Sequence, residues 1–146
     1  MLPLQLALSL FVEHGREKEA AIFYAEAFGA ETGECHLLED GTLFAVDLRF
    51  GETVIHVCGS NPARERNPAH GGPFFPKAAG AVSAVFQLTV DGLDATLARA
   101  IAGGSAERDG IQQDTLGRRV ASVFDPFGHI WALVEERGET QMRAAA

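Results

Sequence analysis

The chain has 146 residues, 47% of them hydrophobic and 22% charged, so it can bury a core and is not expected to be disordered. Its formal net charge of −8 argues against non-specific binding to nucleic acids or acidic membranes, because both require a basic surface. The only cysteines, Cys35 and Cys58, do not make a disulfide scaffold and favour a cytoplasmic protein with reduced thiols.

Residues 2–58 predict a module with the order β-α-β-β-β. Over residues 2–10, leucines alternate with small or polar residues, a period of two that favours a strand over a signal peptide or a membrane span. Helical spacing of apolar residues follows over 16–28, and Gly29 is a natural helix end. Three further strands are expected at residues 32–38, 43–50 and 53–58, the last two joined by the two-residue loop Gly51–Glu52.

Residues 59–80 contain four prolines and four glycines, which exclude a regular helix or a central strand. This segment is expected either to be a solvated linker or to cover something apolar with Phe74 and Phe75. After it the first pattern restarts, offset by about 75 residues, and neither copy could bury its sheet face alone. The second copy predicts a strand at 82–90, a helix at 91–104, a weak strand at 105–113 and a closing hairpin at 118–124 and 129–136.

These elements divide the chain into four parts. They are a first module at residues 1–60, a Pro- and Gly-rich connection at 61–80, a second module at 81–137 and a polar, frayed tail at 138–146. Pairing of the modules would leave each sheet with helices on one side and a shared cavity on the other.

Two motifs point to a known family. Residues 17–31, EKEAAIFYAEAFGAE, and residues 120–136, VASVFDPFGHIWALVEE, resemble the first helix and the C-terminal signature of the vicinal-oxygen-chelate superfamily, which contains glyoxalase I, extradiol dioxygenases and bleomycin-resistance proteins. Residues 85–131 are most similar to its PhnB-like branch. The resemblance implies an α+β fold of two paired βαβββ modules forming a U-shaped barrel around a cavity, and a homodimer. A ferredoxin-like βαββαβ unit fits less well, because each copy here contains a strand hairpin.

Counting outward from the Gly51–Glu52 loop predicts which side chains of the first hairpin share a face. The face expected under the helix carries the pairs Val46–Val57, Leu48–Ile55 and Phe50–Thr53. The face expected to line the cavity carries Asp47–His56, Arg49–Val54 and Ala45–Cys58. Opposite Cβ atoms lie about 5 Å apart, so Asp47 can fix the tautomer of His56 and raise its basicity. This suits a general base or a metal ligand; the alternative is a polar pair without chemistry.

His56 matches a position at which metal-dependent members of the superfamily carry a Glu or His ligand. The other ligand positions that the resemblance implies fall near Ala7, Val85 and Ala132, none of which can bind a metal. A catalytic divalent ion usually needs at least three protein ligands. We therefore expect no metal cofactor, with a divalent metal in a shifted register as the alternative.

The remaining histidines are expected to take no part in the site. A four-residue loop over Asp-Pro-Phe-Gly would pair His129 with Phe124 and give it the parity of Trp131, under the helices, as a structural histidine. Surface positions are expected for His14, His36 and His70.

Other side chains suit an organic ligand better than a metal. Nothing near Cys58 in the sequence marks a thiol of lowered pKa. Arg49 and Arg119 could hold an anionic group or be solvated. The candidate catalytic residues are Asp47 and His56, and the candidate ligand-binding residues are Gln5, Ser9, Arg49, Cys58, Phe74, Phe75, Gln87 and Arg119.

The sequence thus predicts a cytoplasmic, metal-independent protein that binds a small organic molecule, in a composition typical of bacteria with GC-rich genomes. Whether it turns the ligand over or only holds it, as antibiotic-binding relatives do, stays open, because fold alone does not choose. The alternatives are a metal-dependent lyase, isomerase or dioxygenase with His56 as one ligand, and an interaction module with a collapsed cavity. The identity of the ligand, and whether the modules pair within or between chains, also stay open.

Overall fold

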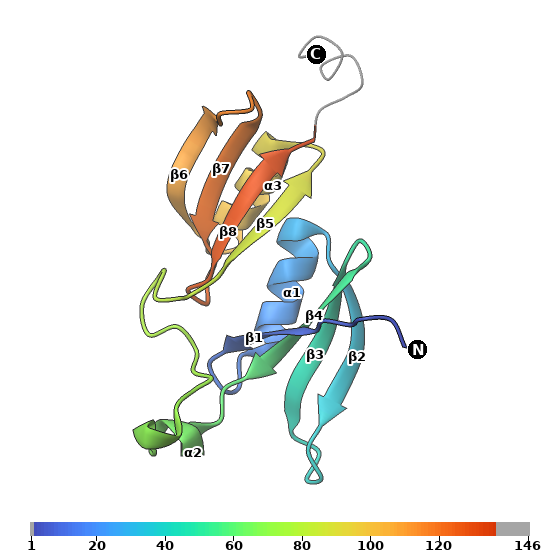
Figure 1. Cartoon of the computed structure of the whole chain (residues 1–146), viewed down its shortest axis with the longest axis vertical. Helices are drawn as coiled ribbons and strands as arrows, with labels where there is room; N and C mark the ends of the chain where they lie inside the picture. The colour runs from blue at the N-terminus through green and yellow to red at the C-terminus, as the bar shows by residue number, and fades with distance from the viewer. Residues whose placement is uncertain (1, 137–146) are drawn as a thin grey trace. The chain divides into compact units, whose positions relative to one another are not determined.

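The computed structural model describes residues 2–136. It consists of two compact units, Met1–Lys77 and Ala78–Ala146, which run from blue to green and from yellow to red in Figure 1. The division falls within residues 61–80, the segment expected to connect the modules. Among the described residues, no helix has the length and apolarity that a membrane crossing requires. The expected tail, 138–146, lies outside the described residues.

The first unit is one four-stranded sheet with a helix on it. Its strands lie in the order β1-β4-β3-β2, with β1 parallel to β4 and the other pairs antiparallel. Two short helices follow the sheet in the chain (Figure 1). The elements are β1 (Leu8–Val12), α1 (Glu17–Phe28), β2 (Glu31–Leu37), β3 (Leu43–Phe50), β4 (Thr53–Gly59), α2 (Pro62–Glu65) and the 3-10 helix η1 (Pro68–His70).

The second unit repeats this topology. Its strands lie in the order β5-β8-β7-β6, again with one parallel pair, β5 with β8. The two βαβββ modules of the predicted α+β fold are therefore confirmed. The elements are β5 (Val85–Val90), α3 (Leu93–Ala102), β6 (Ala106–Gln113), β7 (Arg119–Phe124) and β8 (Ile130–Glu135).

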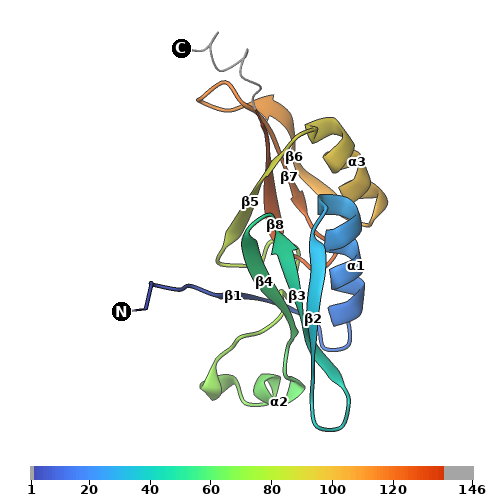
Figure 2. The same cartoon turned by 90° about the vertical axis from the view of Figure 1, so that its right-hand side faces the viewer.

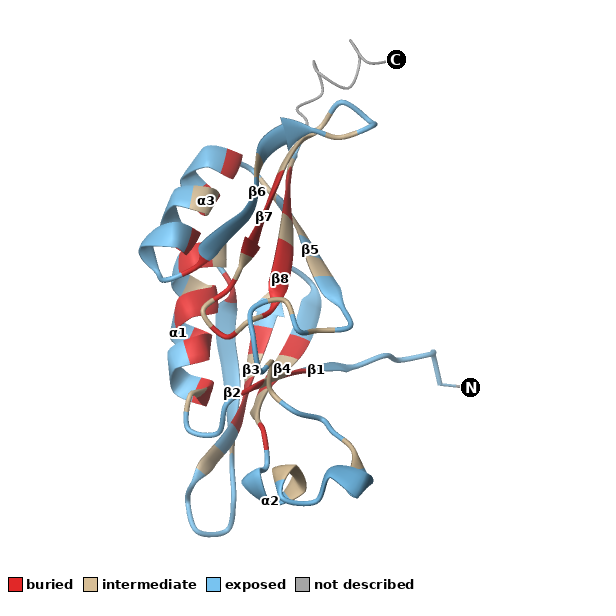
Figure 3. Cartoon of the chain, turned by 90° about the vertical axis from the view of Figure 1, so that its left-hand side faces the viewer, coloured by how far each residue is buried: buried red, intermediate tan, exposed pale blue. Residues whose placement is uncertain are grey.

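The core of the first unit lies between α1 and one face of its sheet (Figures 2 and 3). Two of the three apolar hairpin pairs predicted under the helix, Val46–Val57 and Leu48–Ile55, are buried there. In the third pair Phe50 is only partly buried and Thr53, at the hairpin end, is exposed. Burial of that face leaves the alternate side chains of the same strands on the opposite face. The helix contributes the buried residues Ala20, Ala21, Phe23, Tyr24 and Ala27.

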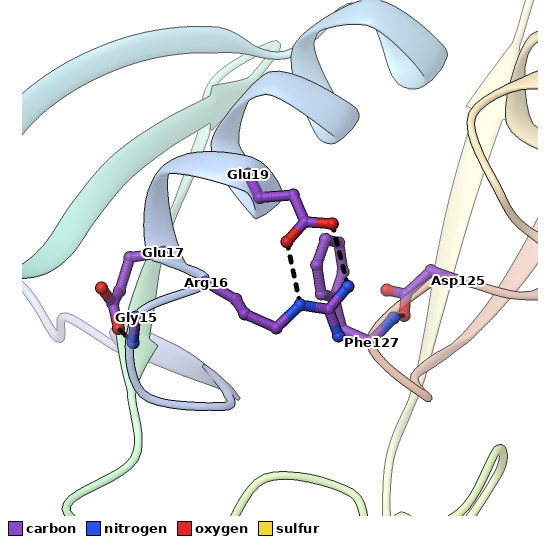
Figure 4. Close-up of polar contacts among 6 residues, drawn as sticks. All are labelled: Gly15, Arg16, Glu17, Glu19, Asp125 and Phe127. Carbon is purple, nitrogen blue, oxygen red and sulfur yellow. Dashed lines mark hydrogen bonds and ion pairs between the residues drawn. The ribbon is translucent and has the colours of Figure 1, made fainter.

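A buried carboxylate marks the start of α1. Glu17 is 3% exposed, and its Oε1 accepts the backbone N–H of Gly15 at 2.6 Å, next to the exposed ion pair of Arg16 and Glu19 (Figure 4). Gly59, at the end of β4, lies against this carboxylate: a Cβ there would be 2.0 Å from Glu17 Oε1. The absence of a side chain at Gly59 therefore makes room for Glu17.

The first strand is shorter than predicted. It begins at Leu8 and not near residue 2, and Leu2, Leu4 and Leu6 are about nine-tenths exposed or more. Leu8 pairs with Ile55, so the chain before Leu6 extends past the beginning of β4. Without a partner strand, the alternating leucines there form no ladder.

The hairpin of β7 and β8 differs from the prediction by one residue. Phe124 pairs with Ile130 and not with His129, so residues 125–129 form the loop. The loop is closed by the Asp125 backbone N–H, which donates to the carbonyl of His129 at 2.8 Å. His129 is buried and lies edge-on to Phe86, which agrees with a structural role.

The carboxylate of Asp125 organises this loop. Its Oδ1 accepts the backbone N–H groups of Phe127 and His129, both at 2.9 Å. Its Oδ2 accepts the indole N–H of Trp131 at 2.9 Å, and the Trp131 ring stacks on Phe86 in the core. Figure 4 shows Asp125 turned toward Phe127. One buried acid therefore links the turn to the largest core side chain of the second unit.

Candidate functional site

The hairpin of β3 and β4 has the predicted register throughout, because the Gly51–Glu52 loop fixes it. Gly51 has a φ of 61°, which this tight turn requires. Asp47 pairs with His56, and Nδ1 of His56 lies 2.5 Å from Oδ1 of Asp47. The predicted neighbours are therefore in direct contact.

Strand β2 contributes a third side chain that sequence reasoning missed. Nε2 of His36 lies 3.0 Å from the same oxygen, Oδ1 of Asp47. A β-bulge between Thr32 and Cys35 places one extra residue in β2 and turns His36 toward the face of Asp47. The one sequence signal was Gly33, since an isolated glycine in a strand indicates a bulge or a close approach. A Cβ at Gly33 would lie 3.3 Å from the carbonyl oxygen of Asp47.

The shared oxygen sets the tautomer of both imidazoles. Burial pushes the pKa of Asp47 upward, but the hydrogen bonds from His56 and His36 outweigh it, so the pKa lies below its ordinary value. Asp47 is then an ionised acceptor, and each ring nitrogen facing it must carry the hydrogen. Neutral His56 is consequently the Nδ1–H tautomer, with the lone pair on Nε2.

These residues lie on the sheet face opposite α1, which we call the polar face. The side chains of His36 and His56 are 38% and 35% exposed and that of Asp47 is 20% exposed, so solutes can reach all three. The polar face is formed by Ser9, His36, Asp47, Arg49, His56 and Cys58.

Two further members of the polar face lie beside His56. Ser9 of β1 pairs with His56 across the parallel ladder. Cys58 is half-buried, and burial, the largest influence, raises the pKa of its thiol, with a hydrogen bond from Ser9 offsetting this only in part. A thiol with a raised pKa is a poor nucleophile near neutral pH. Cys58 is therefore suited to contact a ligand and not to attack it.

Arg49 carries the positive charge of the polar face. Its guanidinium forms an ion pair with Glu31 of β2, and both side chains are well exposed. An exposed pair of this kind contributes little to stability and can exchange partners with an anionic ligand.

The ligand positions that the resemblance implies do not fit a metal centre. His56 lies beside Ser9, and Ala132 pairs with Ser122 and Gln87. Hydroxyl and amide groups replace the imidazoles and carboxylates that bind a catalytic divalent ion. The residue that pairs with His56 is Ser9, and the one that pairs with Ala132 on β5 is Gln87. Each lies two residues after the position expected from the resemblance, Ala7 or Val85.

The other candidates are spread over both units. Gln5 is exposed and precedes β1, and Phe74 and Phe75 follow η1, with the Lys77 ammonium 3.5 Å above the Phe75 ring. In the second unit, Gln87 is exposed on β5. Arg119 forms ion pairs with Asp94 of α3 and with Glu135, so it reaches the helix side of its sheet. Ligand contacts of these residues stay predictions.

Comparison with known proteins identifies relatives. The family model described as "Glyoxalase/Bleomycin resistance protein/Dioxygenase superfamily" matches residues 15–133. An uncharacterised protein of Mycobacterium bovis is 30% identical over 121 residues, which are 82% of this chain and 76% of that protein. A hypothetical protein from S. aureus superposes with a TM-score of 0.69 at 16% identity, covering 93% of this chain and 96% of that one.

A further solved structure bears on the branch. It is described as a putative 3-demethylubiquinone-9 3-methyltransferase, PhnB protein, from Bacillus cereus. It has a TM-score of 0.62 at 15% identity and covers 91% of this chain and all of that one. Such low identities show a common fold and nothing more about activity.

Proposed function

The chain belongs to the glyoxalase/bleomycin resistance protein/dioxygenase superfamily, and on that premise we propose that it binds a small organic molecule on the polar face of its first unit. The observation that carries the proposal is the contact of His56 and His36 with one oxygen of Asp47. The network fixes two imidazoles in place and leaves each with a second ring nitrogen for a ligand.

The chemistry of the polar face indicates what the ligand offers. The Nε2 lone pair of His56 accepts a hydrogen bond, so the ligand presents an O–H or N–H group there. Arg49 attracts an anionic group, such as a carboxylate, in exchange for Glu31. Val54, which pairs with Arg49 and is 44% exposed, offers apolar contact close by. This mixture of apolar surface and a few polar anchors is typical of ligand sites.

The same arrangement would serve catalysis if the ligand is turned over. His56, held by Asp47, would take a proton from the O–H or N–H group that it binds. No step involves a metal, because the positions that the family implies, near Ala7, Val85 and Ala132, offer no imidazole or carboxylate. Their ladder neighbours Ser9 and Gln87 offer none either. We also propose that the protein is a cytoplasmic homodimer of the PhnB-like branch. The composition favours reduced thiols, and the family resemblance implies a homodimer.

A ligand screen tests the proposal. The full chain is purified without a tag, extracted under denaturing conditions and analysed by mass spectrometry for co-purified organic molecules. Hydroxylated and phenolic carboxylates are then tested by thermal shift in the presence of a chelator. The proteins compared are wild type, His56→Gln and, as a matched control, His70→Gln, whose side chain lies in the exposed η1 segment.

The expected result is a compound that raises the melting temperature of wild type and of His70→Gln at similar concentrations. The apparent affinity of His56→Gln for the same compound should be at least tenfold lower. Equal stabilisation of all three proteins by every binding compound would overturn the assignment to the polar face.

A further inference from the structure

We infer that His36, Asp47 and His56 form a binding site for a divalent transition-metal ion of the Zn²⁺ or Co²⁺ class. One ligand atom from each residue lies within 4.8 Å of the other two. Two of these separations are already 2.5 and 3.0 Å, both to Oδ1 of Asp47. Donors bound to one Zn²⁺ at about 2.0–2.2 Å lie roughly 3.3 Å apart, so small side-chain rotations suffice.

The backbone holds the three ligands in place. They come from three adjacent strands, β2, β3 and β4, and Asp47 pairs directly with His56 in the ladder. The bulge in β2 supplies the third ligand by turning His36 onto the same face. A site built on paired strands loses little conformational entropy when it takes up an ion.

The carboxylate of Asp47 can accept more bonds than it does in the metal-free protein. Both imidazoles use Oδ1 of Asp47, and within residues 2–136 its Oδ2 accepts no hydrogen bond. When the ion takes the place of the two imidazole hydrogens, Oδ1 can bind it, and Oδ2 stays available for a second bond to the ion or to water. All three side chains are between one-fifth and two-fifths exposed, so a hydrated ion can enter and keep water in its open positions.

The donor set selects the class of ion. Two imidazole nitrogens and one carboxylate oxygen favour Zn²⁺, Co²⁺, Ni²⁺ or Cu²⁺, whereas Mg²⁺ and Ca²⁺ prefer oxygen ligands only. The site also differs from the one implied by the family, since it shares His56 alone and uses β2 and β3 in place of the other positions.

Coordination changes what His56 offers to an organic ligand. An ion on Nδ1 takes the lone pair of that nitrogen, so the ring hydrogen moves to Nε2. Nε2 then donates a hydrogen bond, where in the metal-free protein it accepts one. Ion binding requires no organic ligand, so this inference can be tested apart from the proposed function.

Metal titration of the full-length protein tests the inference. Tag-free protein is stripped with a chelator, Zn²⁺ binding is measured by calorimetry, and Co²⁺ binding is followed by its visible absorption. We expect one ion per chain, with an absorption intensity typical of four or five ligands including nitrogen. About a hundredfold excess of Mg²⁺ should not displace it.

Variants identify the ligands. His36→Gln is decisive because the side chain lies on an edge strand and outside the hydrophobic core. His36→Gln, Asp47→Asn and His56→Gln should each weaken Zn²⁺ binding at least tenfold, and His70→Gln and Cys58→Ser should bind as wild type does. Circular dichroism checks that each variant is folded.

Three outcomes would overturn the site: no saturable binding by wild type, unchanged affinity in folded His36→Gln, or loss of binding in Cys58→Ser. None of them affects the ligand screen, which is run in the presence of chelator.

Discussion

The rings of His36 and His56 lie 6.4 Å apart, although strand β3 separates the strands that carry them. They approach because both reach the same oxygen of Asp47, and this shared acceptor fixes the tautomer of each ring. The first prediction follows from it directly.

In metal-free protein at pH 8, His56 should be the Nδ1–H tautomer. The replacement Asp47→Asn removes the charged acceptor, so His56 should shift toward the Nε2–H form that an unconstrained histidine side chain prefers. Two-dimensional ¹⁵N–¹H spectra of the histidine side chains distinguish the two tautomers. His70 is the internal control and should be unchanged. A wild-type His56 that is mainly Nε2–H would contradict the hydrogen bond to Asp47.

Loss of the Asp125 carboxylate should destabilise the second unit. Asp125→Ala leaves three buried or partly buried N–H donors without their acceptor, and each such hydrogen bond to a charged group is worth about 1.5–3 kcal/mol. Since the donors share one group and can partly rehydrate, we expect a total loss of about 2–4 kcal/mol. Urea unfolding followed by the fluorescence of Trp131, the only tryptophan, measures it.

Asp125→Asn is the matched control. Its amide oxygen can keep the backbone N–H groups of the turn, but its NH₂ group cannot accept from the Trp131 indole. It should therefore be less destabilising than Asp125→Ala. Equal stability of wild type and Asp125→Ala would show that the carboxylate does not hold this loop.

Gly59→Ala should destabilise the first unit through Glu17. The new Cβ would lie 2.0 Å from Glu17 Oε1, so the carboxylate must move and give up its hydrogen bond from Gly15. We expect a cost of about 1–3 kcal/mol, measured by urea unfolding followed by circular dichroism. In Glu17→Ala protein the same substitution should cost distinctly less, because the obstructing carboxylate is gone. Additive effects in this double-mutant cycle would refute the steric explanation.

The β6–β7 hairpin should show a pH-dependent contribution from Asp114. Backbone N–H groups of Arg118 and Leu116, together with the Arg118 guanidinium, hold the pKa of Asp114 below its ordinary value. A depressed folded-state pKa stabilises the protein above the unfolded pKa of about 3.9. That stability is lost as the pH falls through the folded pKa. Wild type should thus exceed Asp114→Asn in stability at pH 7, and the difference should shrink toward pH 2.

The sequence was sufficient for the elements that follow a strict period and end at a defined turn. The β3–β4 hairpin was predictable pair by pair because Gly51 and Glu52 allow only one loop length. The predicted register of the β7–β8 hairpin was wrong by one residue because Asp125 holds His129 in the loop through hydrogen bonds. The periodicity of apolar residues does not indicate such bonds. The first strand was predicted too long because alternation of leucines with polar residues indicates only a tendency to form a strand. A ladder also needs a partner strand, and β1 has one only from Leu8 onward.

The candidate site was predictable only in part for the same reason. Asp47 and His56 face each other across a regular ladder, so counting found them. His36 reaches them because of the β-bulge in the edge strand β2. The pattern of side chains does not show that the backbone contains one extra residue there. Arg119 was expected among the ligand-binding residues, and its guanidinium forms an ion pair with Asp94 on α3, a contact between strand and helix that the sequence pattern does not indicate.

The bulge in β2 determines which side chains of this strand face Asp47. In β2 two residues, Gly33 and Glu34, lie opposite Asp47 alone, and this extra residue exchanges the faces of Cys35 and His36. If the same residues paired regularly onward from Thr32, with no bulge, Cys35 would lie opposite Ala45 on the face of Asp47, and the cluster would present sulfur where it now presents nitrogen. The hard or soft character of the cluster is therefore set by the pairing register of an edge strand, and a register shift there could alter its chemistry without any substitution among its members.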